Sequence, residues 1–192
     1  MNMLKPIETL FNGHRFRSRL EARWAVFFTV LEVPYDYEPE GYRFERYAYL
    51  PDFLMPSWNV FVEIKPIKPR IDEMQRFIAF AQHAEKSLLI FYGNASADGH
   101  RVIWCSPDGF QGDDLQLAAC RERCGQMFIQ NETWGIQAIA PLTGHDCLNG
   151  ICYFSWPLIW NQLRDAFDAA QGARFEFGEA WHAGLPRNEA PI

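Results

Sequence analysis

The chain has 192 residues, 48% of them hydrophobic and 16% aromatic, which is enough apolar surface for the core of one domain. The net charge of -6 argues against a uniformly basic nucleic-acid-binding protein. No apolar run reaches the length of a membrane span, and the first residues do not resemble a signal peptide, so we expect a cytosolic protein with no membrane partner.

The charge is unevenly distributed along the chain. Residues 1–70 contain ten Lys and Arg against nine Asp and Glu, a net of +1, whereas the remaining residues contain eight against fifteen, a net of -7. Local field matters more than total charge for binding a polyanion, so the first segment stays compatible with a nucleic-acid partner. The odd number of cysteines, five, fits reduced thiols better than a disulfide framework.

The first long element is a predicted amphipathic helix over residues 17–32. Leu20, Trp24, Phe27 and Leu31 recur at the spacing of one helix face. Glu21 then lies in the first turn, at the margin of that face. Because Ser18-x-x-Glu21 matches a capping box, Glu21 could serve the helix terminus instead of a functional site.

Four arginines crowd the start of this helix: Arg15, Arg17, Arg19 and Arg23. They could contact the phosphates of a nucleic acid. The alternative is a solvated face in which Arg23 pairs with an acid, because the spacing spreads these side chains over both sides of the segment.

Short strands follow at residues 35–38, 42–44 and 47–50, separated by turns. The stretch 49–65 then predicts a hairpin whose first strand ends in Pro51-Asp52 and whose second strand covers 60–65. Side chains alternate along a strand, so Val62 and Ile64 should point into the core while Glu63 and Lys65 share the other face. Asp52 should lie within reach of Glu63 across the hairpin.

Two converging carboxylates repel each other and are tolerated where a divalent cation lies between them. Oxygen-rich sites of this kind suit Mg²⁺ or Mn²⁺. A neighbouring lysine can orient or deprotonate a water molecule and offset charge on a phosphate oxygen. The alternative is that Val-Glu-Ile-Lys forms a half-exposed edge strand with Glu63 and Lys65 as its wet face.

The second half of the chain contains fewer patterned segments. A helix over 72–85 carries Gln75 and Gln82, which could face a substrate or lie on the exposed surface. The apolar run 87–92 predicts a buried parallel strand. The other predicted elements are strands at 101–105, 126–130 and 136–140 and a helix over 158–170. Residues 106–150 otherwise show no clear periodicity.

The cysteines of this region allow two interpretations. Cys120, Cys124, Cys147 and Cys152 could supply four soft ligands to zinc, although structural zinc sites use tighter pairs such as Cys-x-x-Cys. Free buried cysteine is the alternative.

Several segments together resemble a known family. They are Phe16-Arg-Ser-Arg-Leu-Glu-Ala-Arg-Trp-Ala, Tyr37-Glu-Pro-Glu-Gly, Tyr49-Leu-Pro-Asp-Phe, and Pro51-Asp52 followed after ten residues by Glu63-x-Lys65. The combination closely resembles the PD-(D/E)xK nuclease superfamily, in particular small stand-alone endonucleases of phages and mobile elements. The resemblance covers roughly residues 11–92, about half of the chain.

This resemblance implies an α/β fold with a restriction-endonuclease-like core, in which a mixed central β-sheet is flanked by α-helices. Residues 1–105 would form the core, 106–155 a Cys-containing insert or β extension that could bind zinc, 156–178 a C-terminal helix packed on the core, and 179–192 a mobile tail.

The resemblance also implies a catalytic set of Glu21, Asp52, Glu63 and Lys65. Asp52 and Glu63 would bind Mg²⁺ or Mn²⁺, with the Ile64 carbonyl as a further ligand and Glu21 at a second metal or an ordered water. Lys65 would position the attacking water. The expected DNA-binding side chains are Arg15, Arg17, Arg19, Lys68 and Arg70.

The implied function is metal-dependent hydrolysis of DNA phosphodiester bonds in the cytoplasm of a bacterial host, by a phage or mobile-element protein. The alternative is a catalytically idle nuclease-like fold that binds nucleic acid or a protein as a regulator. A homodimer is compatible with either function.

Overall fold

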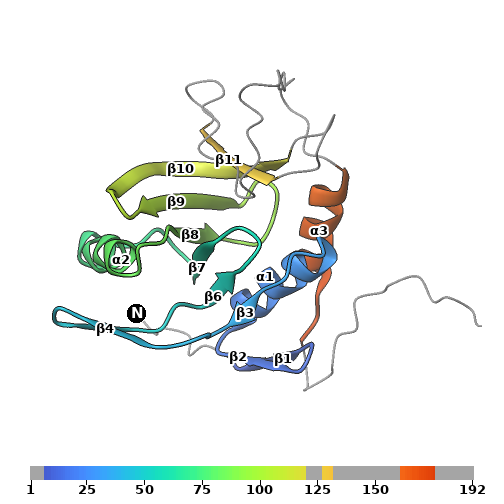
Figure 1. Cartoon of the computed structure of the whole chain (residues 1–192). Helices are drawn as coiled ribbons and strands as arrows, with labels where there is room; N and C mark the ends of the chain where they lie inside the picture. The colour runs from blue at the N-terminus through green and yellow to red at the C-terminus, as the bar shows by residue number, and fades with distance from the viewer. Residues whose placement is uncertain (1–6, 120–126, 132–160, 176–192) are drawn as a thin grey trace, which may run out of the picture.

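A mixed sheet of seven strands forms the centre of the molecule (Figure 1). The computed structural model describes residues 7–119, 127–131 and 161–175. Across the sheet the strands are β11 (Met127–Asn131), β10 (Gly109–Ala119), β9 (His100–Ser106), β8 (Leu88–Gly93), β7 (Val60–Lys65), β6 (Phe53–Met55) and β3 (Asp36–Tyr37). Strands β7 and β8 are parallel, and the other neighbours in this sheet are antiparallel.

Helices lie on both faces of this sheet. They are α1 (Arg19–Val30) and α3 (Asn161–Gly172) on one face and α2 (Ile71–His83) on the other (Figure 1). Two hairpins stand outside the sheet: β1 (Thr9–Phe11) with β2 (His14–Phe16), and β4 (Tyr42–Phe44) with β5 (Tyr47–Tyr49). The predicted α/β class with a mixed, helix-flanked sheet is therefore confirmed, whereas the restriction-endonuclease-like core stays a prediction.

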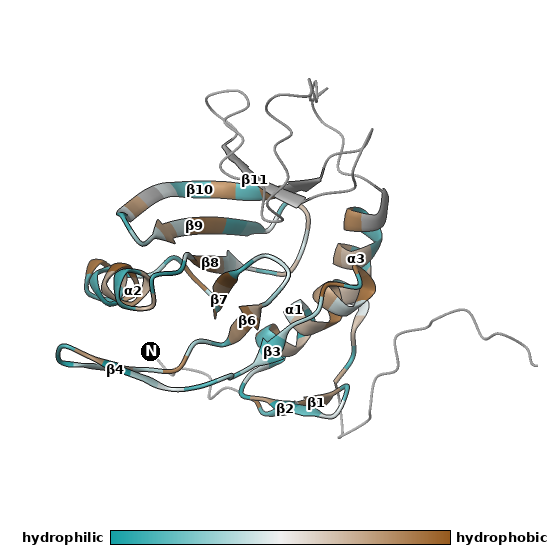
Figure 2. Ribbon diagram, in the orientation of Figure 1, coloured by the Kyte–Doolittle hydropathy of each residue, from teal (hydrophilic) through white to brown (hydrophobic). Residues whose placement is uncertain are grey.

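Each face of the sheet has its own apolar core. Under α1 and α3, the core includes Trp24, Phe27, Phe91 and Phe167, all nearly or fully buried. Under α2 and the β4–β5 hairpin, a second cluster packs Phe77 and Phe80 against Phe61, Leu88 and Ile90. Figure 2 shows hydrophobic residues on β6 and β7, in the centre of the sheet, and on parts of α1 and α3. The alternating side chains of β7 and β8 supply both cores.

Helix α1 begins two residues later than predicted because Ser18 adopts an extended N-cap conformation. The Ser18 hydroxyl accepts a hydrogen bond from the Glu21 N–H at 3.2 Å and donates one to Glu21 Oε1 at 2.8 Å. Capping by Ser18, which the Ser-x-x-Glu spacing predicts, is thus confirmed.

The sheet continues past the point where sequence periodicity fades. Strand β10 extends over 11 residues that were not predicted to be a strand, and its pairing with β9 shifts register on both sides of Gly112. Such bulges interrupt the alternation by which a strand is recognised. Strand β11 lies where a strand was predicted, whereas the strand predicted at 136–140 falls outside the described residues. In the described part of the chain, none of the helices is long and apolar enough to cross a membrane.

His100 connects the helical layer to the sheet. Its ring is 1% exposed and contacts the rings of Trp24 and Phe167. The Leu117 N–H donates to its Nε2 at 3.1 Å, so Nδ1 carries the proton and donates to the Ser96 carbonyl at 2.7 Å. Burial lowers the pKa of His100 to about 4.

We predict that His100 makes folding sensitive to mild acid. The unfolded chain takes up this proton near pH 6.5 and the folded ring only near pH 4. Its contribution to stability is therefore complete above about pH 6.5 and is lost as the pH falls toward 4. Urea denaturation should show the free energy of unfolding dropping by about 2 kcal/mol from pH 7 to pH 5 through this residue.

The variant His100→Gln should be less stable at pH 7 and should lack this part of the decrease. The exposed His14 provides the control, since His14→Gln should keep the wild-type pH dependence. An unchanged pH dependence in His100→Gln would contradict the assignment.

Candidate functional site

Asp52 lies at the start of a strand, not at the end of one. The prediction that the first hairpin strand ends in Pro51-Asp52 is wrong: β6 begins only at Phe53, after Pro51, which has no N–H to donate to a strand ladder. The register pairs Phe53 with Val62, which places Asp52 opposite Glu63. The Ile64 N–H donates to Asp52 Oδ2 at 2.7 Å, so Asp52 is fixed beside β7 as predicted.

Strand β7 is in the interior of the sheet, paired with β6 on one side and β8 on the other. The edge-strand interpretation of Val-Glu-Ile-Lys is therefore wrong. Val62 and Ile64 are buried in the core beneath α1, as expected. Glu63 points to the opposite face, where it is only 5% exposed, and its Oε1 lies 2.9 Å from Lys65 Nζ. A buried carboxylate on an interior strand is not a wet surface residue.

A pocket of about 410 Å³ opens over these side chains. It lies between the start of α1, the end of the β4–β5 hairpin, β7 and α2. Its charged lining consists of three carboxylates and three cations: Glu21, Asp52, Glu63, Arg17, Lys65 and Arg76. The four predicted catalytic residues therefore line one pocket.

Asp52 is held in an unfavourable environment for a charge. It is 3% exposed, and burial, followed by the charges of Glu63 and Glu21, raises its pKa well above the usual value. The Ile64 hydrogen bond and the Arg17 charge act in the opposite direction. Arg17 Nη2 lies 2.5 Å from Asp52 Oδ1, while its Nε lies 2.6 Å from Glu38. One arginine thus bridges two carboxylates at the mouth of the pocket.

Glu63 is positioned by two partners. The Tyr49 hydroxyl, itself almost fully buried, donates to Glu63 Oε2 at 2.6 Å. Burial and the adjacent Glu63 charge raise the pKa of Tyr49 well above its usual value, so Tyr49 stays a hydrogen-bond donor. Lys65 lies on the other carboxylate oxygen and over the Phe77 ring, 5.5 Å from its centroid.

Glu21 reaches the pocket but is already engaged. Its Oε2 accepts from the Tyr37 hydroxyl at 2.7 Å and from the Arg17 N–H at 3.1 Å, and its Oε1 accepts from Ser18. Among the described residues, no three His, Cys, Asp or Glu side chains meet closely enough to hold a metal ion. The site therefore offers two carboxylates, Asp52 and Glu63, with Glu21 behind them.

These two carboxylates suit a hard divalent cation. Mg²⁺ is commonly bound by one or two carboxylates together with substrate phosphate oxygens and water, so a third protein ligand is not needed. The donor set thus fits Mg²⁺ or Mn²⁺.

The residues predicted to bind DNA are separated in the structure. Arg17 lines the pocket, whereas Arg15 is exposed and paired with Glu8. Lys68 pairs with Asp113 and Asp114, and the exposed Arg70 pairs with Asp72. Arg19 and Arg23 line a second pocket, on the other side of α1. No acidic partner of Arg23 is found in the described part of the chain.

Arg76 is a pocket residue that the sequence interpretation missed. Gln75 and Gln82, which could have faced a substrate, are exposed, while Arg76 lines the pocket. Its guanidinium lies 5.6 Å from the Tyr49 ring centroid and 5.2 Å from that of Phe77. Its Nε is buried without a hydrogen-bond partner in the described structure. The sequence signal was its position one residue before Phe77, at the margin of the apolar stripe.

The cysteines considered as zinc ligands are not among the residues of this pocket. Cys120, Cys124, Cys147 and Cys152 lie outside the described residues, so the zinc site stays a prediction. Cys105 on β9 is a buried free thiol, and burial raises its pKa to about 12.

We predict that Asp52→Asn stabilises the folded protein. The carboxylate is destabilised once ionised, so its cost to stability grows as the pH rises from about 4 toward its raised pKa in the folded state. Asparagine can still accept the Ile64 hydrogen bond. In urea denaturation, the variant should gain on the order of 1 kcal/mol at pH 8 and less at pH 5.

The exposed Asp36 on β3 provides the matched control, because Asp36→Asn removes a carboxylate without relieving a buried charge. Equal or lower stability of Asp52→Asn at pH 8 would show that Arg17 fully compensates the buried charge.

Comparisons of the chain with protein-family models, with curated proteins and with solved structures found no match. The resemblance to PD-(D/E)xK nucleases therefore stays a hypothesis that depends on the residues lining this pocket.

Proposed function

We propose that this protein is a metal-dependent DNA endonuclease that hydrolyses phosphodiester bonds. One observation carries the proposal: Asp52 and Glu63, both buried, face each other across neighbouring strands in a pocket that also contains Lys65 and Arg76. Two carboxylates with adjacent cations are the groups required to bind a divalent ion and a phosphodiester at one place.

Asp52 and Glu63 would hold Mg²⁺ or Mn²⁺, with the Ile64 carbonyl as a further protein ligand and Glu21 behind them. When bound, the ion supplies positive charge to the phosphate and lowers the pKa of water. The Tyr49 hydroxyl fixes the orientation of the Glu63 carboxylate, as hydrogen bonds to metal-ligating carboxylates do.

Without a metal ion, Arg17 forms an ion pair with Asp52, and Lys65 forms one with Glu63. With a metal ion on these carboxylates, Lys65 would be free to orient the attacking water and to steady charge on the phosphate. Arg17 can remain on Glu38, 2.6 Å from its Nε, while it leaves Asp52.

Arg76 completes the positive side of the pocket. No carboxylate ion-pair partner of Arg76 is found among the described residues, so an incoming phosphate oxygen would balance its charge. We assign to Arg76 the binding of the DNA phosphate that is cut.

The experiment that tests the function is cleavage of labelled DNA with Mg²⁺, with Mn²⁺ and with EDTA. The substrates are duplex, single-stranded, flap and branched DNA, and wild type is compared with Asp52→Ala and Lys65→Ala. We expect cutting with either metal, none with EDTA, and losses of at least about 100-fold in both variants. Full activity of Asp52→Ala would rule out the assignment.

We predict that Arg76→Ala lowers the cleavage rate at saturating DNA by roughly 100-fold, because the charge on the phosphate loses a pre-positioned partner. Arg76→Lys should recover only part of this loss, since lysine lacks the guanidinium fork. The exposed Arg43 on β4 serves as the control, and Arg43→Ala should cut like wild type. A wild-type rate for Arg76→Ala would remove Arg76 from the site.

A second function is favoured by the same ion pairs. Because Arg17 and Lys65 already neutralise Asp52 and Glu63, the pocket is tolerable without a metal, as in an idle nuclease-like protein that binds nucleic acid or a protein partner. DNA binding without cutting under any metal condition would favour this regulator. A homodimer, a phage or mobile-element origin and a location in the bacterial cytoplasm stay predictions.

A further inference from the structure

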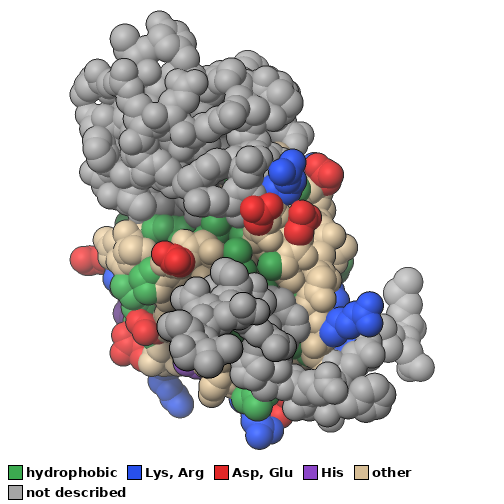
Figure 3. Space-filling view, turned by 90° about the vertical axis from the view of Figure 1, so that its right-hand side faces the viewer, with side chains coloured by type: hydrophobic (Ala, Val, Ile, Leu, Met, Phe, Trp, Pro, Cys, Tyr) green, Lys and Arg blue, Asp and Glu red, His purple; other side chains and the backbone are tan. Residues whose placement is uncertain are grey.

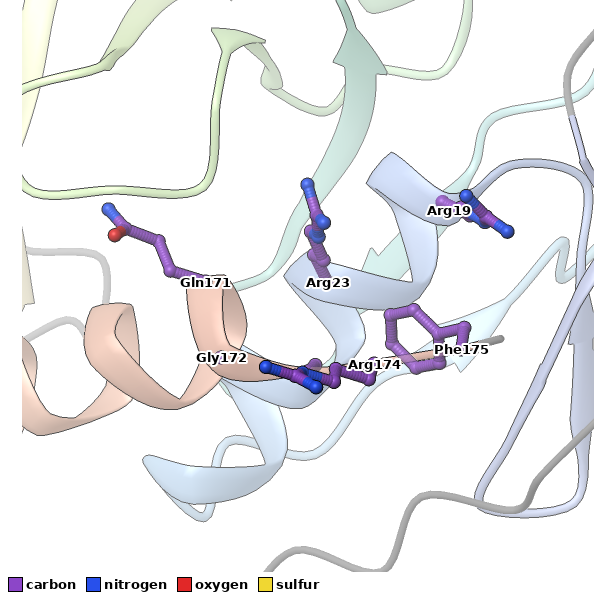
Figure 4. Close-up of a pocket in the computed structure, with 7 residues that line it drawn as sticks. Arg19, Arg23, Gln171, Gly172, Arg174 and Phe175 are labelled. Carbon is purple, nitrogen blue, oxygen red and sulfur yellow. The ribbon is translucent and has the colours of Figure 1, made fainter. Parts of the chain in front are cut away.

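A second pocket, which the proposed chemistry does not use, lies on the other side of α1. It has a volume of about 420 Å³ and is formed by α1, the end of α3 and the segment after it. Figure 4 shows Arg19 and Arg23 extending from α1, and Gln171 and Arg174 from the chain around the end of α3. Phe175 lines the pocket as well, so its lining combines three guanidinium groups with one aromatic ring.

The charge of this pocket is unbalanced. Its lining contains three arginines and no acidic side chain. The Nε atoms of Arg19 and Arg23 are buried and have no hydrogen-bond partner among the described residues. A buried donor without an acceptor costs roughly 1–3 kcal/mol, and like charges in one pocket add to that cost. An anion in the pocket would offset the charge of these three arginines.

Elsewhere on this side of the molecule, charges are mixed. Figure 3 shows basic and acidic side chains near each other on the visible described surface around α3. The arginine pocket therefore differs from its surroundings by excluding carboxylates. Gln171 and Arg174 are exposed, which leaves the pocket open to a ligand from solvent.

Helix geometry relates this pocket to the candidate active site. Arg19 and Arg23 are four residues apart and share one face of α1, while Glu21, midway between them, points to the opposite face and lines the first pocket. The two pockets therefore lie on opposite faces of the first turns of α1.

We propose that Arg19, Arg23 and Arg174 bind a phosphate group of the DNA at a position other than the one that is cut. Guanidinium forks match phosphate oxygens in geometry, and Arg19 and Arg23 come from the helix that also carries Glu21. This inference rests on the proposed nuclease function for its ligand. The pocket would fix the register of the DNA strand relative to Asp52 and Glu63.

The test is DNA binding measured by fluorescence anisotropy in EDTA, where no cutting interferes. Wild type is compared with Arg23→Ala, with Arg174→Ala and with the double variant. We expect each single variant to bind roughly tenfold more weakly, and the slope of log affinity against log salt to fall by about one for each arginine removed. Arg174 is exposed, so its removal does not endanger the fold.

The matched control is Arg46→Ala on the exposed turn between β4 and β5, which removes the same charge at a position outside both pockets. Affinity and salt slope equal to wild type in both pocket variants would overturn the proposal. So would an equal loss in Arg46→Ala, because the effect would then reflect total charge alone.

Two further experiments are needed. One distinguishes a terminal from an internal phosphate, and the other distinguishes failure of the nuclease proposal from failure of the pocket proposal. Binding is measured with duplexes that carry a 5′-phosphate or a 5′-hydroxyl. If the pocket binds a terminal phosphate, the pocket variants lose affinity for the phosphorylated duplex alone; if it binds an internal phosphate, they lose affinity for both duplexes. If the wild type binds DNA through these arginines but never cuts it, the nuclease function is rejected and the pocket proposal stands.

If the wild type cuts DNA and the pocket variants bind as well as wild type, the pocket proposal is rejected and the nuclease function stands. If the wild type does not bind DNA, the pocket proposal is rejected.

Discussion

The hydrogen bond from the Ile64 N–H to the Asp52 carboxylate is the contact on which the candidate site depends. It joins the residue that precedes β6 to the interior strand β7 and holds Asp52 opposite Glu63. Without it, a buried aspartate beside another buried carboxylate would have little reason to stay in place. The sheet provides this fixed position because β7 is paired on both sides and both of its faces are packed.

Positive charge makes this arrangement tolerable. Arg17 binds Asp52 and Lys65 binds Glu63, so each acid has one cation, and Tyr49 adds a neutral donor. Burial, together with the charges of Glu63 and Glu21, nevertheless raises the pKa of Asp52. Sites that bind and transform ligands commonly keep such strained electrostatics at a cost to stability. Under our proposal, substrate and metal relieve this cost.

Much of the fold followed from local patterns. Local sequence patterns predicted α1, β7 and β8, because each pattern allows the apolar side chains to be buried in only one type of secondary structure. The patterns are the apolar stripe and Ser18 cap of α1, the alternation in β7 and the continuous apolar run of β8. The long strand β10 was not predicted, because its bulges interrupt the alternation of buried and exposed side chains. Asp52 was expected at a strand end because the sequence does not show that Pro51 delays the next strand.

Site residues were predictable where a motif brought them close in sequence or in a hairpin. Glu63 and Lys65 are two residues apart, and Asp52 is their neighbour across a short turn. The position of Arg76 in the pocket depends on how α2 is rotated relative to the sheet. This rotation is set by the packing of Phe77 and Phe80 on the second core. The arginine pocket requires Arg174, which is distant in sequence and reaches α1 only through the packing of α3.

Anomalous diffraction at the manganese edge, from crystals of the protein grown with Mn²⁺ and an uncleavable DNA, shows whether Asp52 and Glu63 hold the metal. We expect a peak between the Asp52 and Glu63 carboxylates, with Arg17 moved off Asp52, and no such peak in Asp52→Asn. DNA bound in the pocket with no peak there, and with Arg17 still on Asp52, would contradict this expectation.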